Sequence, residues 1–210
     1  MIMSLTNCFL KYLVIVFCLM ITKGVDLMDL NKWFDQGISK QAYKNTLTNH
    51  KDAFNHIYEH FSFPNNNEYY LEKIKNQNLR VLIIAQEFCG HCMLDVPIMF
   101  RLAEKTNMPV SVLVRDDNLD LMDQYLTNEK RVIPIFIFIN ENGEEVAKWG
   151  PFAPEIKEYV DNLNRDMPPK DDPNFDEAFK SLIEEVGHTF KYDEKYWHYV
   201  YEDLIKKLTK

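Results

Sequence analysis

Two cysteines three residues apart are the residues in this sequence best suited to chemistry. Cys89 and Cys92 enclose Gly90 and His91, and they are the only cysteines after residue 18 of the 210-residue chain. Cysteines at this spacing on one helical turn face each other and can close a disulfide. A single CxxC lacks the second pair that a zinc ribbon needs. The pair therefore predicts thiol–disulfide exchange.

The expected place of the motif gives each cysteine its own role. Cys89 is predicted near a helix N-cap, where free N–H groups and the helix dipole stabilise an attacking thiolate. Cys92, one turn deeper, is expected to be buried and protonated and to resolve a mixed disulfide by attacking Cys89. Gly90 keeps the entrance open. His91 is expected to stabilise the thiolate and make the disulfide a better oxidant, or else to be an exposed histidine with little effect.

The elements that must position this motif follow from hydrophobic periodicity and turn signals. Short apolar runs predict strands, the first of them a buried parallel strand directly before the cysteines, and Asn142-Gly143 predicts a hairpin. The predicted order is strand 79–85, helix 90–105, strand 109–115, short helix 119–126, strand 134–140, strand 144–149 and helix 154–164. This βαβαββα order predicts an α/β fold with a central mixed sheet.

The remaining segments predict added helices around this core. We divide the chain into residues 1–27, 28–78 with N-terminal helices, 79–164 as the core, and 165–210 as a linker and an amphipathic helical tail packed on the domain. Residues 12–21 are apolar and uncharged, so residues 8–21 have three interpretations: a signal peptide, a short anchor, or a mis-called start ahead of Met28. A start at Met28 predicts a cytoplasmic protein. Either other interpretation places it at a membrane or outside the cell.

At the motif the sequence resembles the thioredoxin family. An aromatic residue, Phe88, precedes the CxxC, and Cys-Gly-His-Cys is similar to the active site of protein disulfide isomerase. Pro97 matches the proline that kinks the family's active-site helix. Ile133-Pro134 matches the family's Ile-Pro. The resemblance implies that the peptide bond before Pro134 is cis and that Pro134 faces the cysteines. It also implies that the backbone of Ile133 pairs with the substrate chain.

The sequence also departs from that family pattern. The family's buried aspartate falls at Ile83 and its partner lysine near Val112, so a proton relay would be absent or built differently, from Glu87 or Asp116. From Met28 onward the chain is similar to small bacterial thioredoxin-family proteins with added terminal helices. The alternative function is a redox-inactive thioredoxin-fold module that binds a partner through the groove beside Pro134.

Composition limits the other functions. A net charge of −8 argues against nucleic-acid binding, which needs a basic surface. His56-x-x-Glu59-His60 resembles an inverted zinc-protease motif, but its neighbours favour an ordinary amphipathic helix, and no metal is predicted. No nucleotide-binding or flavin motif is visible. We therefore predict no cofactor, a disulfide-containing protein or small thiol as substrate, and a separate reductant.

Overall fold

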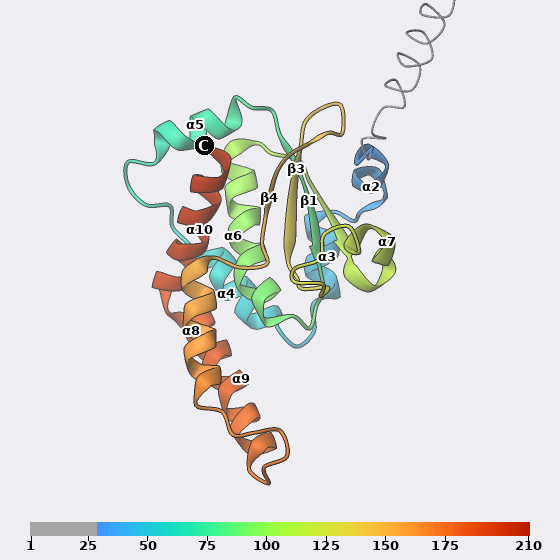
Figure 1. Cartoon of the computed structure of the whole chain (residues 1–210). Coiled ribbons are helices and arrows are strands. Elements are labelled where there is room, and N and C mark those ends of the chain that lie inside the picture. The colour runs from blue at the N-terminus through green and yellow to red at the C-terminus, as the bar shows by residue number, and fades with distance from the viewer. Residues whose placement is uncertain (1–28) are drawn as a thin grey trace, which may run out of the picture.

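The computed structural model describes residues 29–210 and contains a four-stranded mixed sheet at its centre (Figure 1). The strands are β1 (Arg80–Ala85), β2 (Val110–Val114), β3 (Ile135–Ile139) and β4 (Glu145–Trp149), in the spatial order β2-β1-β3-β4. β1 pairs with β2 in parallel and with β3 antiparallel, and β4 returns antiparallel beside β3. The predicted mixed sheet and βαβαββα order are confirmed.

The central strands are apolar because both of their faces are covered. Every residue of β3 is buried, and β1 is buried from Val81 to Ala85. Continuous apolar runs of this kind are expected where helices lie on both sides of a sheet. In Figure 1, α6 (Gly90–Thr106) and α10 (Glu194–Leu208) lie on one side of the sheet and α7 (Leu119–Met122) on the other.

Helix α6 carries the motif and is enclosed over most of its length. It follows β1, begins after Cys89 as its N-cap, and ends at Asn107, which adopts the left-handed conformation typical of a helix C-terminus. Residues 92–100 are all buried, and α6 belongs to the same hydrophobic core as the strands and α10. This burial fixes the motif firmly at the edge of the core.

The N-terminal segment forms four short helices. They are α2 (Asn31–Gln36), α3 (Lys40–Thr46), α4 (Lys51–His60) and α5 (Glu68–Lys75). Between α2 and α3, Ile38 exchanges two backbone hydrogen bonds with Val112 of β2, at 2.8 and 2.9 Å. This single bridge covers part of the outer edge of the sheet, which would otherwise expose unpaired backbone groups.

The C-terminal segment forms three helices, and the last of them packs on the domain. α8 (Pro154–Arg165) buries only Ile156 and, with α9 (Phe175–Tyr192), extends away from the sheet in Figure 1. α10 returns to contact α6, α8, α9 and β4. The Trp197 indole N–H donates to the Phe190 carbonyl at 2.7 Å, which joins α10 to α9. α9 and α10 are separated at Asp193, which caps the start of α10.

The apolar segment that the sequence analysis assigned to residues 8–21 lies outside the described residues. Among residues 29–210, no helix combines the length and the hydropathy that a membrane span requires.

Candidate active site

Cys89 and Cys92 lie where the N-terminal end of α6 meets the end of β1. Cys89 is the N-cap residue, and its sulfur accepts a hydrogen bond from the Cys92 backbone N–H at 3.3 Å. Both cysteines are free thiols; Cys89 is partly accessible, whereas Cys92 is 1 % exposed. The geometry therefore agrees with an accessible first thiol and a protected second one.

The surroundings of Cys89 favour its thiolate. A hydrogen bond from the Cys92 thiol lowers the pKa of Cys89 most strongly, and partial burial opposes this. Backbone N–H groups of the first helical turn and the nearby positive charge of Arg115 lower this pKa further. Because the thiolate is the attacking species, these contacts increase the reactivity of Cys89 near neutral pH.

Cys92 has the opposite character. Burial raises the pKa of Cys92 well above its ordinary value, and the hydrogen bond to Cys89 and the negative charges of Cys89 and Asp95 raise it further. The two thiols therefore separate into one that ionises easily and one that keeps its proton. Such a separation is what a nucleophile and a resolving thiol require.

His91 is not the exposed histidine of the second interpretation. Its ring packs between Phe152 and Phe190, with ring centroids 4.9 and 5.7 Å away, and its Nδ1 has no hydrogen-bond partner among the described residues. Burial lowers the pKa of His91 to about 4. The imidazole is therefore neutral at physiological pH and supplies no positive charge to the thiolate. The nearby cation is Arg115.

Ile133 and Pro134 lie beside the cysteines, and the peptide bond between them is cis, as the resemblance implied. The Cys89 thiol donates to the Ile133 carbonyl oxygen at 3.5 Å. Gly150 lies behind this loop with φ +119°, and a Cβ there would collide with the Pro134 carbonyl oxygen. Close packing of Gly150 thus holds the loop against the N-terminal end of α6.

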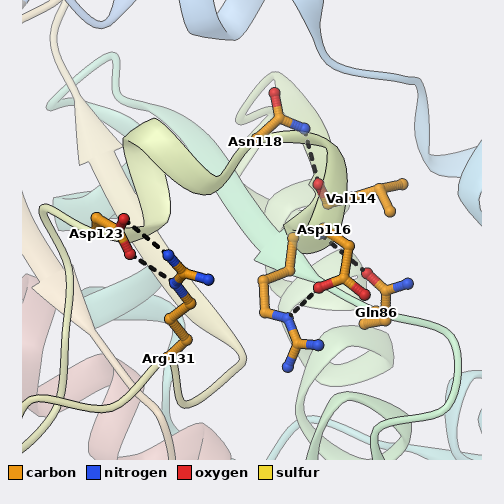
Figure 2. Close-up of polar contacts among 7 residues, drawn as sticks. Gln86, Val114, Asp116, Asn118, Asp123 and Arg131 are labelled. Atoms are coloured by element: carbon orange, nitrogen blue, oxygen red, sulfur yellow. Dashed lines mark hydrogen bonds and ion pairs between the residues drawn. The ribbon is translucent and has the colours of Figure 1, made fainter.

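Figure 2 shows polar contacts among the loops that follow β1 and β2 and that precede β3. The Arg131 guanidinium donates to both carboxylate oxygens of Asp123, at 2.6 and 2.9 Å, and so anchors the segment that leads to Ile133. On the other side, Arg115 pairs with Asp116 at 2.8 Å, and the Asp116 backbone N–H donates to the Gln86 side chain at 3.4 Å. These contacts connect the end of β2 to the loop before Cys89.

The segment before the motif is held by the N-terminal helices. The Thr48 hydroxyl donates to the Glu87 carboxylate at 3.2 Å, and a His50 ring nitrogen lies 3.2 Å from the Phe88 carbonyl oxygen. Gly90 has no atom within 4 Å of the position that a Cβ would occupy, so the entrance beside it is open. The Phe88 side chain is 52 % exposed next to that entrance.

Sequence reasoning missed Arg115, Tyr43 and Asp95. Tyr43 reaches the site from α3, where burial and the charges of Cys92, Cys89 and Glu87 raise its pKa. Asp95 is buried on α6, and the sequence does contain a signal for it: a lone acid in the apolar run 92–100. Arg115 and Tyr43 have no comparable local signal, because only the folded chain brings them to the cysteines.

The histidine motif of α4 does not form a metal site with a third ligand. His56 and His60 stack with ring centroids 4.2 Å apart, and the His60 ring contacts the His56 carbonyl. Across residues 29–210, no group of three or more histidine, cysteine, aspartate or glutamate side chains is arranged to hold a metal ion.

Comparisons with known proteins agree with this architecture. A family model described as thioredoxin matches residues 37–164. A protein of unknown function from Pseudomonas aeruginosa has a similar structure, with a TM-score of 0.52 and 14 % identity over 81 % of this chain and 95 % of that one. An HIV epitope scaffold has a TM-score of 0.52 and 15 % identity over 82 % and 97 %. The search of curated proteins found no match.

Proposed function

Because the chain belongs to the thioredoxin family, we propose that it is a thiol–disulfide oxidoreductase that uses the Cys89/Cys92 dithiol. The observation that carries this proposal is the contrast between the two thiols. The pKa of Cys89 is lowered and this residue is partly exposed, whereas the pKa of Cys92 is raised and this residue is buried. A binding module has no need of such a contrast.

In the proposed reaction the Cys89 thiolate attacks a substrate disulfide. One substrate sulfur leaves as a thiol, and the other joins Cys89 in a mixed disulfide. Cys92 then attacks the Cys89 sulfur, loses its proton, and releases the second substrate thiol. The substrate disulfide gains two electrons and two protons, and the dithiol becomes the Cys89–Cys92 disulfide. A separate reductant restores the dithiol.

The loops around Cys89 support a disulfide-bearing polypeptide or a small disulfide as substrate. The Ile133 carbonyl oxygen lies 3.5 Å from the Cys89 sulfur, which supports pairing of the Ile133 backbone with a substrate chain. Phe88 and the open side of Gly90 offer an apolar and unobstructed approach. The direction of exchange in the cell depends on the reduction potential of the couple and on its compartment.

Trapping of the mixed disulfide tests this proposal. The Cys92→Ser protein, mixed with a fluorescent peptide disulfide, should form a stable adduct at Cys89, because no second thiol can release it. The wild type should turn over and release free peptide thiol. The Cys89→Ser protein is the matched control and should form no adduct. An accessible dithiol that forms neither adduct nor internal disulfide would leave the binding module as the function.

A further inference from the structure

A buried carboxyl group on α6 has no partner that would explain its position. Asp95 is 0 % exposed, and neither of its carboxylate oxygens has a hydrogen-bond partner among the described residues. No lysine or arginine in residues 29–210 forms an ion pair with it. A buried polar group without a partner costs free energy, so Asp95 contributes nothing to holding the fold together.

The position of Asp95 places it with the two thiols. It follows Cys92 by three residues on α6, so both side chains lie on one face of the helix. Side chains on a helix lean toward its N-terminus, which directs the carboxyl toward Cys92 rather than away from it. Burial is the main cause of the raised pKa of both Cys92 and Asp95; the charge of Asp95 adds to the rise at Cys92, and the charge of Cys89 adds to the rise at Asp95. The three groups therefore share one poorly hydrated space.

Two other ionisable side chains, Tyr43 and Glu87, lie near the thiols. Tyr43 of α3 is 1 % exposed, its hydroxyl has no partner among the described residues, and its pKa is raised beyond its ordinary range. The charge of Glu87 contributes to the raised pKa of Tyr43, but the Glu87 carboxylate already accepts a hydrogen bond from Thr48. Asp116, the other carboxyl that the sequence suggested, is half exposed and pairs with Arg115. Asp95 is the carboxyl that is both enclosed and unengaged.

We propose that Asp95 is the proton acceptor for Cys92 when Cys92 resolves the mixed disulfide. The proposal rests on the exchange reaction proposed above. The Cys92 S–H bond breaks as the proton moves to an Asp95 oxygen, and the Cys92 sulfur forms a bond to the Cys89 sulfur. The bond from Cys89 to the substrate sulfur breaks, and its electron pair leaves with that sulfur, which takes up a proton. The acceptor thus comes from the active-site helix, whereas the sheet position at Ile83 is apolar.

The charge of Cys89 would also time the action of Asp95. In the dithiol the Cys89 thiolate opposes ionisation of Asp95. Once Cys89 forms the mixed disulfide, its negative charge disappears and that opposition ends. Asp95 then ionises more readily and gives its proton to the substrate thiolate that left in the first step, which leaves a carboxylate at the stage when Cys92 must lose its proton. Attack by Cys89 would in this way prepare the base for the following step.

Single-turnover kinetics of the Asp95→Asn protein test the proposal. Rapid mixing with a fluorescent peptide disulfide, followed by acid quench, separates formation of the mixed disulfide from its resolution. We expect resolution at neutral pH to slow by roughly a hundredfold, within the range typical of general-base catalysis. The wild-type resolution rate should rise with pH to a plateau set by Asp95. The variant should instead rise continuously with hydroxide concentration.

The matched control is Glu104→Gln, another carboxyl-to-amide change on α6. Glu104 pairs with Lys40 and Tyr58 away from the thiols, so its loss tests general loosening of the helix. We expect this control to keep the wild-type pH profile. Wild-type rate and pH profile in Asp95→Asn would overturn the assignment of Asp95. A wild type that forms no mixed disulfide would instead overturn the proposed function.

A spectroscopic measurement tests the timing without an Asp95 variant. Infrared spectra of protein with isotope-labelled aspartate would be compared between Cys92→Ser in its thiol form and its trapped mixed disulfide. We expect the band of a buried protonated carboxyl to weaken in the mixed disulfide. A band of equal intensity in both forms would show that Asp95 does not become a base at this stage.

Discussion

At the scale of single residues, the active-site helix combines groups whose protonation depends on burial as much as on their neighbours. Cys89 lies at the helix N-terminus and is driven toward its charged form, whereas Cys92, His91 and Asp95 are driven toward their neutral forms. The reactive charge is thus confined to the one sulfur that a substrate can reach.

His91 gives a prediction about acid stability. Its pKa is about 4 in the folded protein and 6.5 in an unfolded chain, so the unfolded chain binds more protons between these values. The free energy of unfolding should therefore fall as pH decreases from 6.5 toward 4, by up to about 3 kcal/mol from this residue. Chemical denaturation of His91→Leu across this range should show a smaller decline than the wild type.

His188 provides the control for this measurement. It is an exposed histidine on α9, so replacing it with glutamine should preserve the wild-type decline. Equal declines in His91→Leu and the wild type would mean that the ring of His91 titrates in the folded state as it does in water.

Residue roles were predictable from the sequence where local pattern decides them. The spacing of Cys89 and Cys92 and the strand before them predicted the N-cap and the buried second thiol, because helix geometry fixes both. The neutral state of His91 was not predictable, since Phe152 and Phe190 reach it from distant segments. The contribution of Arg115 was hidden for the same reason.

At the scale of elements, the site depends on how closely three loops approach the N-terminal end of α6. The loops are those before Cys89, before β3 and after β4, and Gly150 is the tightest point between the last two. A residue with a side chain would face two penalties there: the positive φ and a collision with the Pro134 carbonyl.

Replacing Gly150 with alanine should therefore destabilise the fold by about 2 kcal/mol or more, measured by thermal or chemical unfolding. It should also slow adduct formation at Cys89, because the Ile133 carbonyl would be displaced. Gly187→Ala is the contrasting substitution. Gly187 lies inside α9 with open space around it, so alanine should stabilise the protein by about 0.5–1 kcal/mol. Similar stability of both variants would argue against a tight contact at Gly150.

Element types were predicted well, but their ends and partners less so. The short helix predicted over 119–126 ends as α7 at Met122, and turns follow it. The pairing of Ile38 with the β2 edge could not be inferred, because one bridging residue leaves no strand pattern in the sequence. Periodicity identifies a helix or strand but does not say which neighbour covers it.

At the scale of the whole molecule, the core is continuous from the N-terminal helices to the last helix. Leu30, Phe54 and Leu204 belong to the same cluster of buried residues as the strands and α6. α10 takes part in this core through Trp197, Val200 and Leu204, which are at most 2 % exposed. The division into separate N-terminal, core and tail segments remains a prediction about the chain and its folding.

A core substitution in α10 tests this dependence. Trp197→Ala should cost about 3–5 kcal/mol, because it leaves a cavity and breaks the hydrogen bond to Phe190. Unfolding should remain a single transition, and Cys92 should become accessible to alkylation in that same transition. Ile183 on α9 is 53 % exposed, so Ile183→Ala should change the free energy of unfolding by less than about 0.5 kcal/mol. Loss of α10 alone, with Cys92 still protected, would contradict one shared core.

The distance in sequence between α6 and α10 has a consequence for the protein while it is being made. Cys89 and Cys92 leave the ribosome long before residues 194–208 exist to cover their helix. At translation rates of about 5–20 residues per second, that interval is about 5–20 seconds. During that interval α6 lacks the part of its cover that α10 supplies, so the thiols are less protected from oxidants than in the finished protein. Newly made chains should therefore depend more on a reducing environment, or on a chaperone, than the finished protein does.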